Sequence, residues 1–165
     1  MTTFRPLFAS LILGAILAGC AGGPNPEELQ KGVESAIQAK DYAGAVAKAD
    51  EALKSEAIAK DAAKAWRFES LKLQALAEGG KGADVLASLE RLGATNDKQL
   101  TPALYRSLAE KLRAAKDTQG ANDVLVAGDK KFPEDPSFKK AIEELNSAAD
   151  PAEIERLKAL GYLGD

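Results

Sequence analysis

Two residue types limit the chemistry that this chain can carry. It contains no histidine and one cysteine, Cys20. Without histidine it lacks the most common general base and metal ligand, and Ser-His-Asp and Cys-His catalysis are excluded. We therefore expect a protein that is not an enzyme and that uses no cofactor and no metal.

The remaining chemical motifs have simpler interpretations. Ser137 and Lys140 have the spacing of a Ser-Lys catalytic pair, but they lie at the expected start of a helix, where both would be solvated. Adjacent carboxylates such as Glu143 and Glu144 do not face each other on a helix. Segment 79–82, Gly-Gly-Lys-Gly, lacks the preceding strand and the Lys-Ser/Thr order of a phosphate-binding loop. We interpret it as a turn between helices.

The sequence before Cys20 is the most specific motif. A short segment with one cation, Arg5, precedes an apolar stretch from Leu7 to Ala18, and small residues follow. This order is typical of a secretory signal peptide. The residues Leu17-Ala18-Gly19-Cys20 resemble the lipobox of bacterial lipoproteins, in which cleavage occurs just before the cysteine.

The lipoprotein resemblance implies that residues 1–19 are a removed signal peptide. It also implies that Cys20 carries a diacylglycerol on sulfur and an acyl chain on its amino group, and two or three acyl chains give stable attachment. In enterobacterial lipoproteins an Asp at position 21 favours the inner membrane, so Ala21 implies the periplasmic side of the outer membrane; the inner membrane and the cell surface remain alternatives. A transmembrane anchor, which needs about 20 apolar residues, and an ordinary signal peptide with an incidental cysteine are the alternative interpretations.

Composition predicts an all-α domain after a short tether. Residues 20–25 form the lipidated cysteine and tether, and residues 26–165 are numerous enough for one domain. Alanine, the strongest helix former, is abundant and β-branched residues are few. Charges of both signs are interspersed, with a formal net charge of −3, and no basic block suggests a nucleic-acid partner. With Cys20 lipidated, no thiol remains for a disulfide, so packing alone must hold the fold.

Residues typical of helix ends predict eight helices. Asn25, Thr101, Asp135 and Asp150 each precede a proline, which is the N-cap and first-position pattern of a helix start. Gly79-Gly80, Gly93 and Gly161 follow apolar periodic segments, as helix ends do. The predicted helices lie near 26–39, 42–55, 60–78, 83–92, 102–115, 119–131, 136–147 and 151–160.

A Gly-Ala pair recurs along the chain. Three Gly-Ala pairs, at 44–45, 82–83 and 120–121, follow one another at intervals of 38 residues, and each lies at the expected start of the second helix of a helical hairpin. Such a period in an all-helical chain is typical of a solenoid of hairpins. We expect Ala45, Ala83 and Ala121 to lie at the closest approach of the two antiparallel helices of each hairpin.

These hairpins resemble the tetratricopeptide repeat. The third unit matches best, although Leu112, Leu125 and Gly128 depart from the usual tyrosine, aromatic residue and alanine; the first helix of the first unit matches poorly, and the second unit needs a one-residue adjustment. The resemblance implies a right-handed solenoid of about three repeats, near 27–57, 60–93 and 102–133, with a cap near 136–165. An irregular helical bundle is the alternative. The matching residues of the third unit are Tyr105, Leu108, Ala109, Leu112, Ala121, Leu125, Gly128 and Pro133.

The last segment, 151–163, has the pattern of an amphipathic helix. Ile154, Leu157, Leu160 and Tyr162 provide apolar residues that could cover the end of the stack. A solenoid needs such a terminal cap with a polar outer face. A docking peptide for a partner is the alternative.

The tetratricopeptide resemblance also implies a concave groove lined by first helices. The candidate partner-binding residues in this groove are Arg67, Gln74, Arg106, Glu110 and Arg113. Arginine can bind a carboxylate through two hydrogen bonds, so the ligand could be an acidic segment or a C-terminus; plain surface charges are the other interpretation. We predict a membrane-anchored, periplasm-facing scaffold or adaptor that binds another envelope protein or peptide during envelope assembly. The alternative is a non-catalytic structural lipoprotein that binds lipid or cell-wall material.

Overall fold

A computed structural model describes residues 25–146 and 151–161 of the chain, and this part is all-helical. The all-α prediction is thereby confirmed at the level of fold class. Within these residues no helix is both long and apolar enough to cross a membrane. Cys20, the signal peptide and most of the tether lie outside the described residues, as do Asp150 and Tyr162. In chain order the helices are α1 (Pro26–Gln38), α2 (Tyr42–Lys54), α3 (Glu56–Ala59), α4 (Ala62–Glu78), α5 (Gly82–Thr95), a 3-10 turn η1 (Asp97–Gln99), α6 (Pro102–Ala114), α7 (Thr118–Lys131), α8 (Ser137–Asn146) and α9 (Pro151–Ala159).

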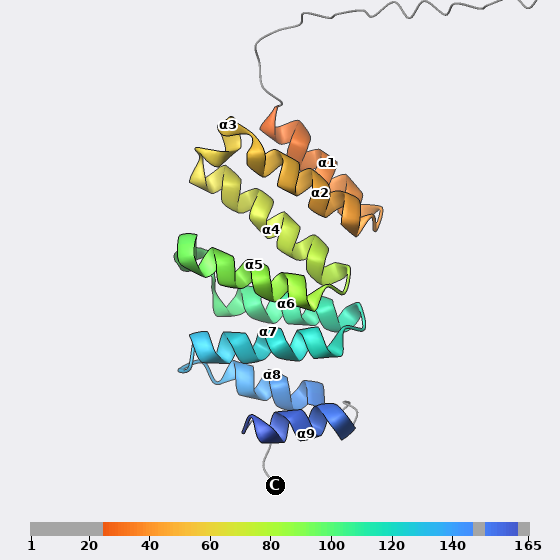
Figure 1. Cartoon of the computed structure of the whole chain (residues 1–165), viewed down its shortest axis with the longest axis vertical. Coiled ribbons are helices and arrows are strands. Elements are labelled where there is room, and N and C mark those ends of the chain that lie inside the picture. The colour runs from red at the N-terminus through yellow and green to blue at the C-terminus, as the bar shows by residue number, and fades with distance from the viewer. Residues whose placement is uncertain (1–24, 147–150, 162–165) are drawn as a thin grey trace, which may run out of the picture.

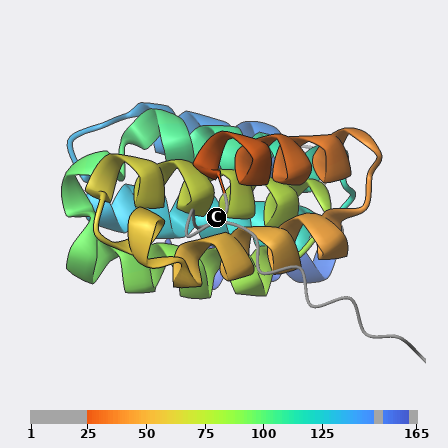
Figure 2. The same ribbon diagram turned by 90° about the horizontal axis from the view of Figure 1, so that it is seen from above.

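The helices are stacked along one long axis, with α1 at one end and α9 at the other (Figure 1). Seen along that axis, α1 and α6 lie in one row and α2 and α5 lie in the other (Figure 2). Along the stack α4 packs on α2 and α6, and α7 packs on α5, α6 and α8. Each helix therefore contacts near neighbours in the sequence, and the ends of the stack do not meet.

Three turns between paired helices have the same hydrogen bonds. In each, one residue has a positive φ, and the next residue donates its N–H across the helix end at 2.9 Å, which is the Schellman geometry. That next residue is also the N-cap of the following helix. The positive-φ residues are Lys40, Gly80 and Lys116. The N–H groups of Asp41, Lys81 and Asp117 donate to the carbonyl oxygens of Ala36, Leu76 and Leu112, respectively.

These turns give a different register from the one expected from the Gly-Ala pairs. They align 44–45 with 84–85 and 120–121, so Ala45, Val85 and Ala121 are equivalent, and all three are fully buried. Ala83 lies two residues out of register and is exposed. The prediction that Ala83 lies at a tight crossing is wrong, because the turns are unevenly spaced: Gly80 follows Lys40 by 40 residues, and Lys116 follows Gly80 by 36.

The glycines in the first turns of α5 and α7 instead allow these two neighbouring helices to pack closely. A Cβ placed on Gly82 of α5 would lie 2.4 Å from the Cα of Gly120 in α7. The same turn is tied by Asp117, whose carboxylate accepts from the Gly120 N–H at 2.9 Å and from the Gly82 N–H at 2.8 Å. One side chain therefore caps the first turns of both α5 and α7.

The expected helix starts are largely confirmed. Asn25 caps α1 and Thr101 caps α6, and α9 begins at Pro151. Asp135 accepts from the backbone N–H of Ser137 at 3.0 Å, and α8 begins one residue later than expected. Three aspartates that sequence reasoning had not marked as caps, at 41, 61 and 117, accept from first-turn amides of α2, α4 and α7.

The expected helix ends differ at one site. Gly80 and Gly161 have positive φ values at helix ends, but Gly93 lies inside α5, which continues to Thr95. Gly93 does not have the positive φ that marks a glycine cap, and the helix ends where the Asn96 N–H donates to the Leu92 carbonyl. The short helices α3 and η1 were not expected, because four and three residues are too few to show a period.

The core consists of two clusters that share α4. The N-terminal cluster contains Val33, Ala36, Ile37, Ala45, Ala49, Ala52, Ile58, Phe68 and Ala75, so most of its members are alanine. The C-terminal cluster is larger and richer in leucine, and it includes Leu73, Leu76, Leu112, Leu125, Phe138 and Ile142. Val46 packs against both.

An aromatic cluster accounts for the glycine at position 128. The rings of Tyr105, Phe132 and Phe138 pack with centroids 5.9–6.5 Å apart. A Cβ on Gly128 would lie 2.3 Å from the Phe138 ring, so glycine at this position admits the ring.

Candidate functional site

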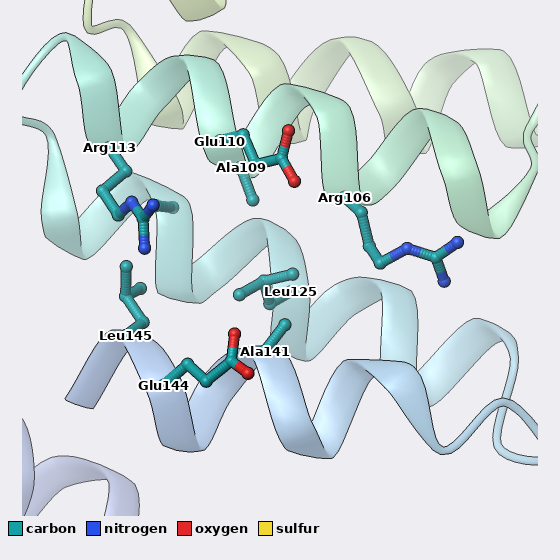
Figure 3. A pocket seen from close by; sticks show the side chains of 9 residues that line it. Arg106, Ala109, Glu110, Arg113, Leu125, Ala141, Glu144 and Leu145 are labelled. Atoms are coloured by element: carbon teal, nitrogen blue, oxygen red, sulfur yellow. The ribbon is translucent and has the colours of Figure 1, made fainter. Parts of the chain in front are cut away.

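A pocket opens between α6 and α8, with α7 beneath it (Figure 3). Its volume is about 100 Å³. Helix α6 contributes Arg106, Ala109, Glu110 and Arg113. Helix α7 contributes Ala121 and Leu125, and α8 contributes Ala141, Glu144 and Leu145. Three of the five predicted partner-binding residues therefore line one pocket.

The floor of the pocket is apolar. Ala109, Ala121, Leu125 and Leu145 are buried, and Ala141 is partly buried against the same cluster. Ala109 and Ala141 keep the floor low, because their side chains end at Cβ, whereas a longer side chain at either position would fill the space. The stacking of α6 and α8 on the same helix, α7, places these residues together.

Arg106 is already bound within the molecule. Its guanidinium donates to the Asp135 carboxylate at 3.2 Å and to the Ser137 hydroxyl, and it lies 5.8 Å from the centre of the Phe138 ring. The pKa of the Asp135 carboxyl is lowered because the Ser137 hydroxyl and backbone N–H donate to it, with Arg106 adding to the effect. Arg106 therefore holds the start of α8 at one edge of the pocket.

The other charged side chains remain at the pocket rim. Glu110 and Arg113 are exposed, and neither forms an ion pair with another residue in the described part of the chain. Glu144 lies 3.7 Å from Lys140, and both side chains are well exposed. In Figure 3, Glu110 and Glu144 lie on opposite sides of the pocket centre, and Arg113 lies toward one end.

Gln74 and Arg67 do not line this pocket. Gln74 donates to Glu78 at 2.9 Å, and Glu78 also accepts from Lys111 of α6 at 2.7 Å, so this group bridges α4 and α6. Partial burial raises the pKa of Glu78, but the hydrogen bonds from Lys111 and Gln74 outweigh it and the pKa is lowered. Arg67 is exposed on α4. Gln74 lies as far before the positive-φ residue Gly80 as Glu110 lies before Lys116, so the two occupy equivalent positions. By the same count Arg67 corresponds to Ala103.

Sequence reasoning missed the contribution of α8, because segment 136–165 had been assigned to a cap. Glu144, Ala141 and Leu145 complete the pocket from that helix. The available signal was the aspartate spacing: Asp150 follows Asp117 by 33 residues, close to the 36 residues between the second and third turns, which would have predicted a further pair of helices in this segment. Arg156 of α9 binds Asp123 of α7 at 2.7 Å.

A second groove lies on the other row of helices, between α2 and α5 above α4. It is lined by Tyr42, Val46, Leu76, Gly79 and Asp84, among others, and encloses about 460 Å³. Tyr42 and Asp84 occupy the positions that Gly82 and Gly120 occupy in the α5–α7 contact. These larger side chains keep α2 and α5 from packing as α5 and α7 do, and the two helices scarcely touch.

The residues of the Ser-Lys spacing do not pair with each other. The Ser137 hydroxyl donates to Asp135 and accepts from Arg106, whereas the Lys140 ammonium lies beside Glu144. Their geometry is that of a capped helix start with an exposed ion pair one turn later.

Comparison with known proteins adds no further constraint on the site. No protein-family model matches the sequence, and no curated protein or solved structure is significantly similar to it.

Proposed function

We propose that this chain is a membrane-anchored, periplasm-facing lipoprotein whose helical stack is a scaffold or adaptor for another envelope protein. The stack is proposed to be a tetratricopeptide-like solenoid of paired helices. The three matching Schellman turns support this assignment, as does the contact of each pair with the next along the chain. A solenoid of this kind presents a concave surface lined by its first helices.

The observation that carries the binding proposal is the pocket between α6 and α8. An apolar floor with a few charged groups at its rim is the usual composition of a binding site. Its rim includes Glu110 and Arg113, which have no ion-pair partner among the described residues and are therefore available to a ligand.

Site-specific photocrosslinking tests this proposal in native envelopes. A photoreactive residue placed at 110 on α6 or at 144 on α8 should capture the same partner polypeptide, because both positions face the pocket. The matched control is position 107, where Ser107 is exposed on α6 but does not line the pocket. Equal capture from position 107, or capture of cell-wall or lipid material instead of a polypeptide, would refute the scaffold proposal.

The proposed membrane anchor has its own test. Cys20→Ser removes the atom that would be acylated, so the protein should leave the membrane fraction after a high-salt wash or accumulate as uncleaved precursor. Separation of inner and outer membranes then tests the proposed outer-membrane location. Retention of the variant equal to that of the parent would contradict the lipoprotein assignment.

A further inference from the structure

We infer that the pocket between α6 and α8 binds a lysine or arginine side chain of its partner, rather than the acidic group that the arginines of α6 suggest. This inference rests on the proposed function for one point only, that the ligand is a polypeptide.

The first reason is that Arg106 is engaged outside the pocket centre. Its charge is offset by Asp135 at 3.2 Å, and the same nitrogen, Nη1, also donates to Ser137 at the start of α8. In Figure 3 its guanidinium points along α6 away from the pocket centre. An acidic ligand at the centre would therefore have only Arg113, at one end, as a counter-charge.

The second reason is the placement of the two carboxylates. Glu110 projects from α6 and Glu144 from α8, and they flank the part of the pocket above Leu125 (Figure 3). A cation at that point has a carboxylate on each side, whereas an anion would meet both. Glu144 has Lys140 at 3.7 Å, but exposed pairs of this kind are weak and can be exchanged for a ligand's charge.

The third reason is the shape and polarity of the floor. Lysine and arginine bury their methylene stems along apolar surface while the charged head stays at the rim. Ala109, Leu125 and Ala141 provide such a surface beneath the two carboxylates.

The inference is tested by NMR titration of the purified domain with four small probes. These are the N-acetyl methylamides of lysine, arginine, glutamate and norleucine; norleucine has an unbranched alkyl side chain without the charge. We expect the lysine and arginine probes to shift the methyl signals of Leu125 and Ala141 and to saturate at a concentration at least threefold lower than norleucine does. This preference should decrease as salt is added, because exposed charges are screened.

Variants identify the groups responsible. The double variant Glu110→Gln with Glu144→Gln should abolish the preference for lysine over norleucine, while binding of norleucine remains. Glu143→Gln, an exposed carboxylate on α8 that does not line the pocket, is the matched control and should leave the preference unchanged. Circular dichroism and unchanged methyl signals of the N-terminal cluster show that each variant is folded.

Three results would overturn the inference: equal or tighter binding of the glutamate probe, a lysine preference that survives the double variant, or no shift with any probe. The scaffold proposal is separable from it. If partner capture from positions 110 and 144 persists while the lysine preference is absent, the scaffold proposal stands and the cation assignment fails.

Discussion

At the scale of single residues, the contact between Gly82 and Gly120 allows no side chain. A Cβ on Gly82 would lie 2.4 Å from backbone, which cannot move aside as a flexible side chain can. Gly82→Ala should therefore lower the free energy of unfolding by about 1–3 kcal/mol. Gly32→Ala is the control, because a Cβ there meets nothing within 4 Å and alanine should stabilise α1 by about 0.5–1 kcal/mol. Urea unfolding midpoints measure both changes; a loss in both variants would contradict the contact.

The corrected register gives a second prediction for single residues. Ala45→Leu and Ala121→Leu should each cost about 1–3 kcal/mol, because both alanines are fully buried and added methylenes overpack the core. Ala83→Leu should change stability by less than about 0.5 kcal/mol, because Ala83 is exposed. Thermal or urea unfolding of the three variants distinguishes this register from the one in which all three alanines are equivalent.

At the scale of helices, the Asp117 carboxylate accepts hydrogen bonds from the first turns of both α5 and α7. Asp41→Ala removes one capping hydrogen bond, from Gly44 at 3.0 Å, and should cost about 1 kcal/mol. Asp117→Ala also leaves the Gly82 N–H without its acceptor, and a buried unpaired donor costs about a further 1–3 kcal/mol. Equal urea midpoints for the two variants would show that the bond to Gly82 contributes nothing.

The bridge between α4 and α6 predicts a pH dependence. The folded-state pKa of Glu78 is lowered, so its contribution to stability is present above the unfolded-state pKa, near about 4.3, and is lost as the pH falls through the folded-state pKa. Glu78→Gln should therefore lower the free energy of unfolding at about pH 7, and this difference from the parent should largely disappear at about pH 2. Glu143→Gln is the matched exposed control. A stability difference between parent and Glu78→Gln that does not depend on pH would contradict this prediction.

Local signals in the sequence predicted the helices well, because caps and prolines act within one turn. Asn25 and Thr101 start helices where expected, and Gly80 ends one. The sequence did not reveal which residues of the second hairpin are equivalent to those of the other two. The Gly-Ala pair at 82–83 has the same two residue types as the pairs at 44–45 and 120–121, but equivalent positions are set by the geometry of the turns. Segments 39–41 and 115–117 are both Ala-Lys-Asp, but they are 76 residues apart, which equals the distance from Gly44 to Gly120, so aligning them does not reveal the displaced second turn at Gly80.

The pocket could be predicted only in part. Arg106, Glu110 and Arg113 share a helix face, which spacing reveals. The bond from Arg106 to Asp135 spans 29 residues and depends on how α8 packs on α7, which no local pattern encodes. The same packing brings Glu144 to the pocket, and it was missed for the same reason.

At the scale of the whole molecule, the two core clusters should open separately. Ile58→Ala in the N-terminal cluster and Leu112→Ala in the C-terminal cluster each remove a fully buried side chain and cost about 2–5 kcal/mol. Because the clusters are linked mainly through α4, with Val46 of α2 as a further contact, amide hydrogen exchange in α1 and α2 should accelerate in the first variant and exchange in α7 in the second. Acceleration in all helices by either variant would indicate one cooperative unit.

The wide spacing of α2 and α5 has a mechanical consequence. On that side of the stack Tyr42 and Asp84 hold the second helices apart, whereas Gly82 and Gly120 lock the next pair together. Bending about α4 can widen the gap between α2 and α5 without compressing packed atoms, whereas bending that brings α5 and α7 closer presses backbone against backbone. We therefore expect the segment from α5 to α8 to be stiffer than its junction with the first helices at α4, so that a load on this segment would be taken up by bending at that junction.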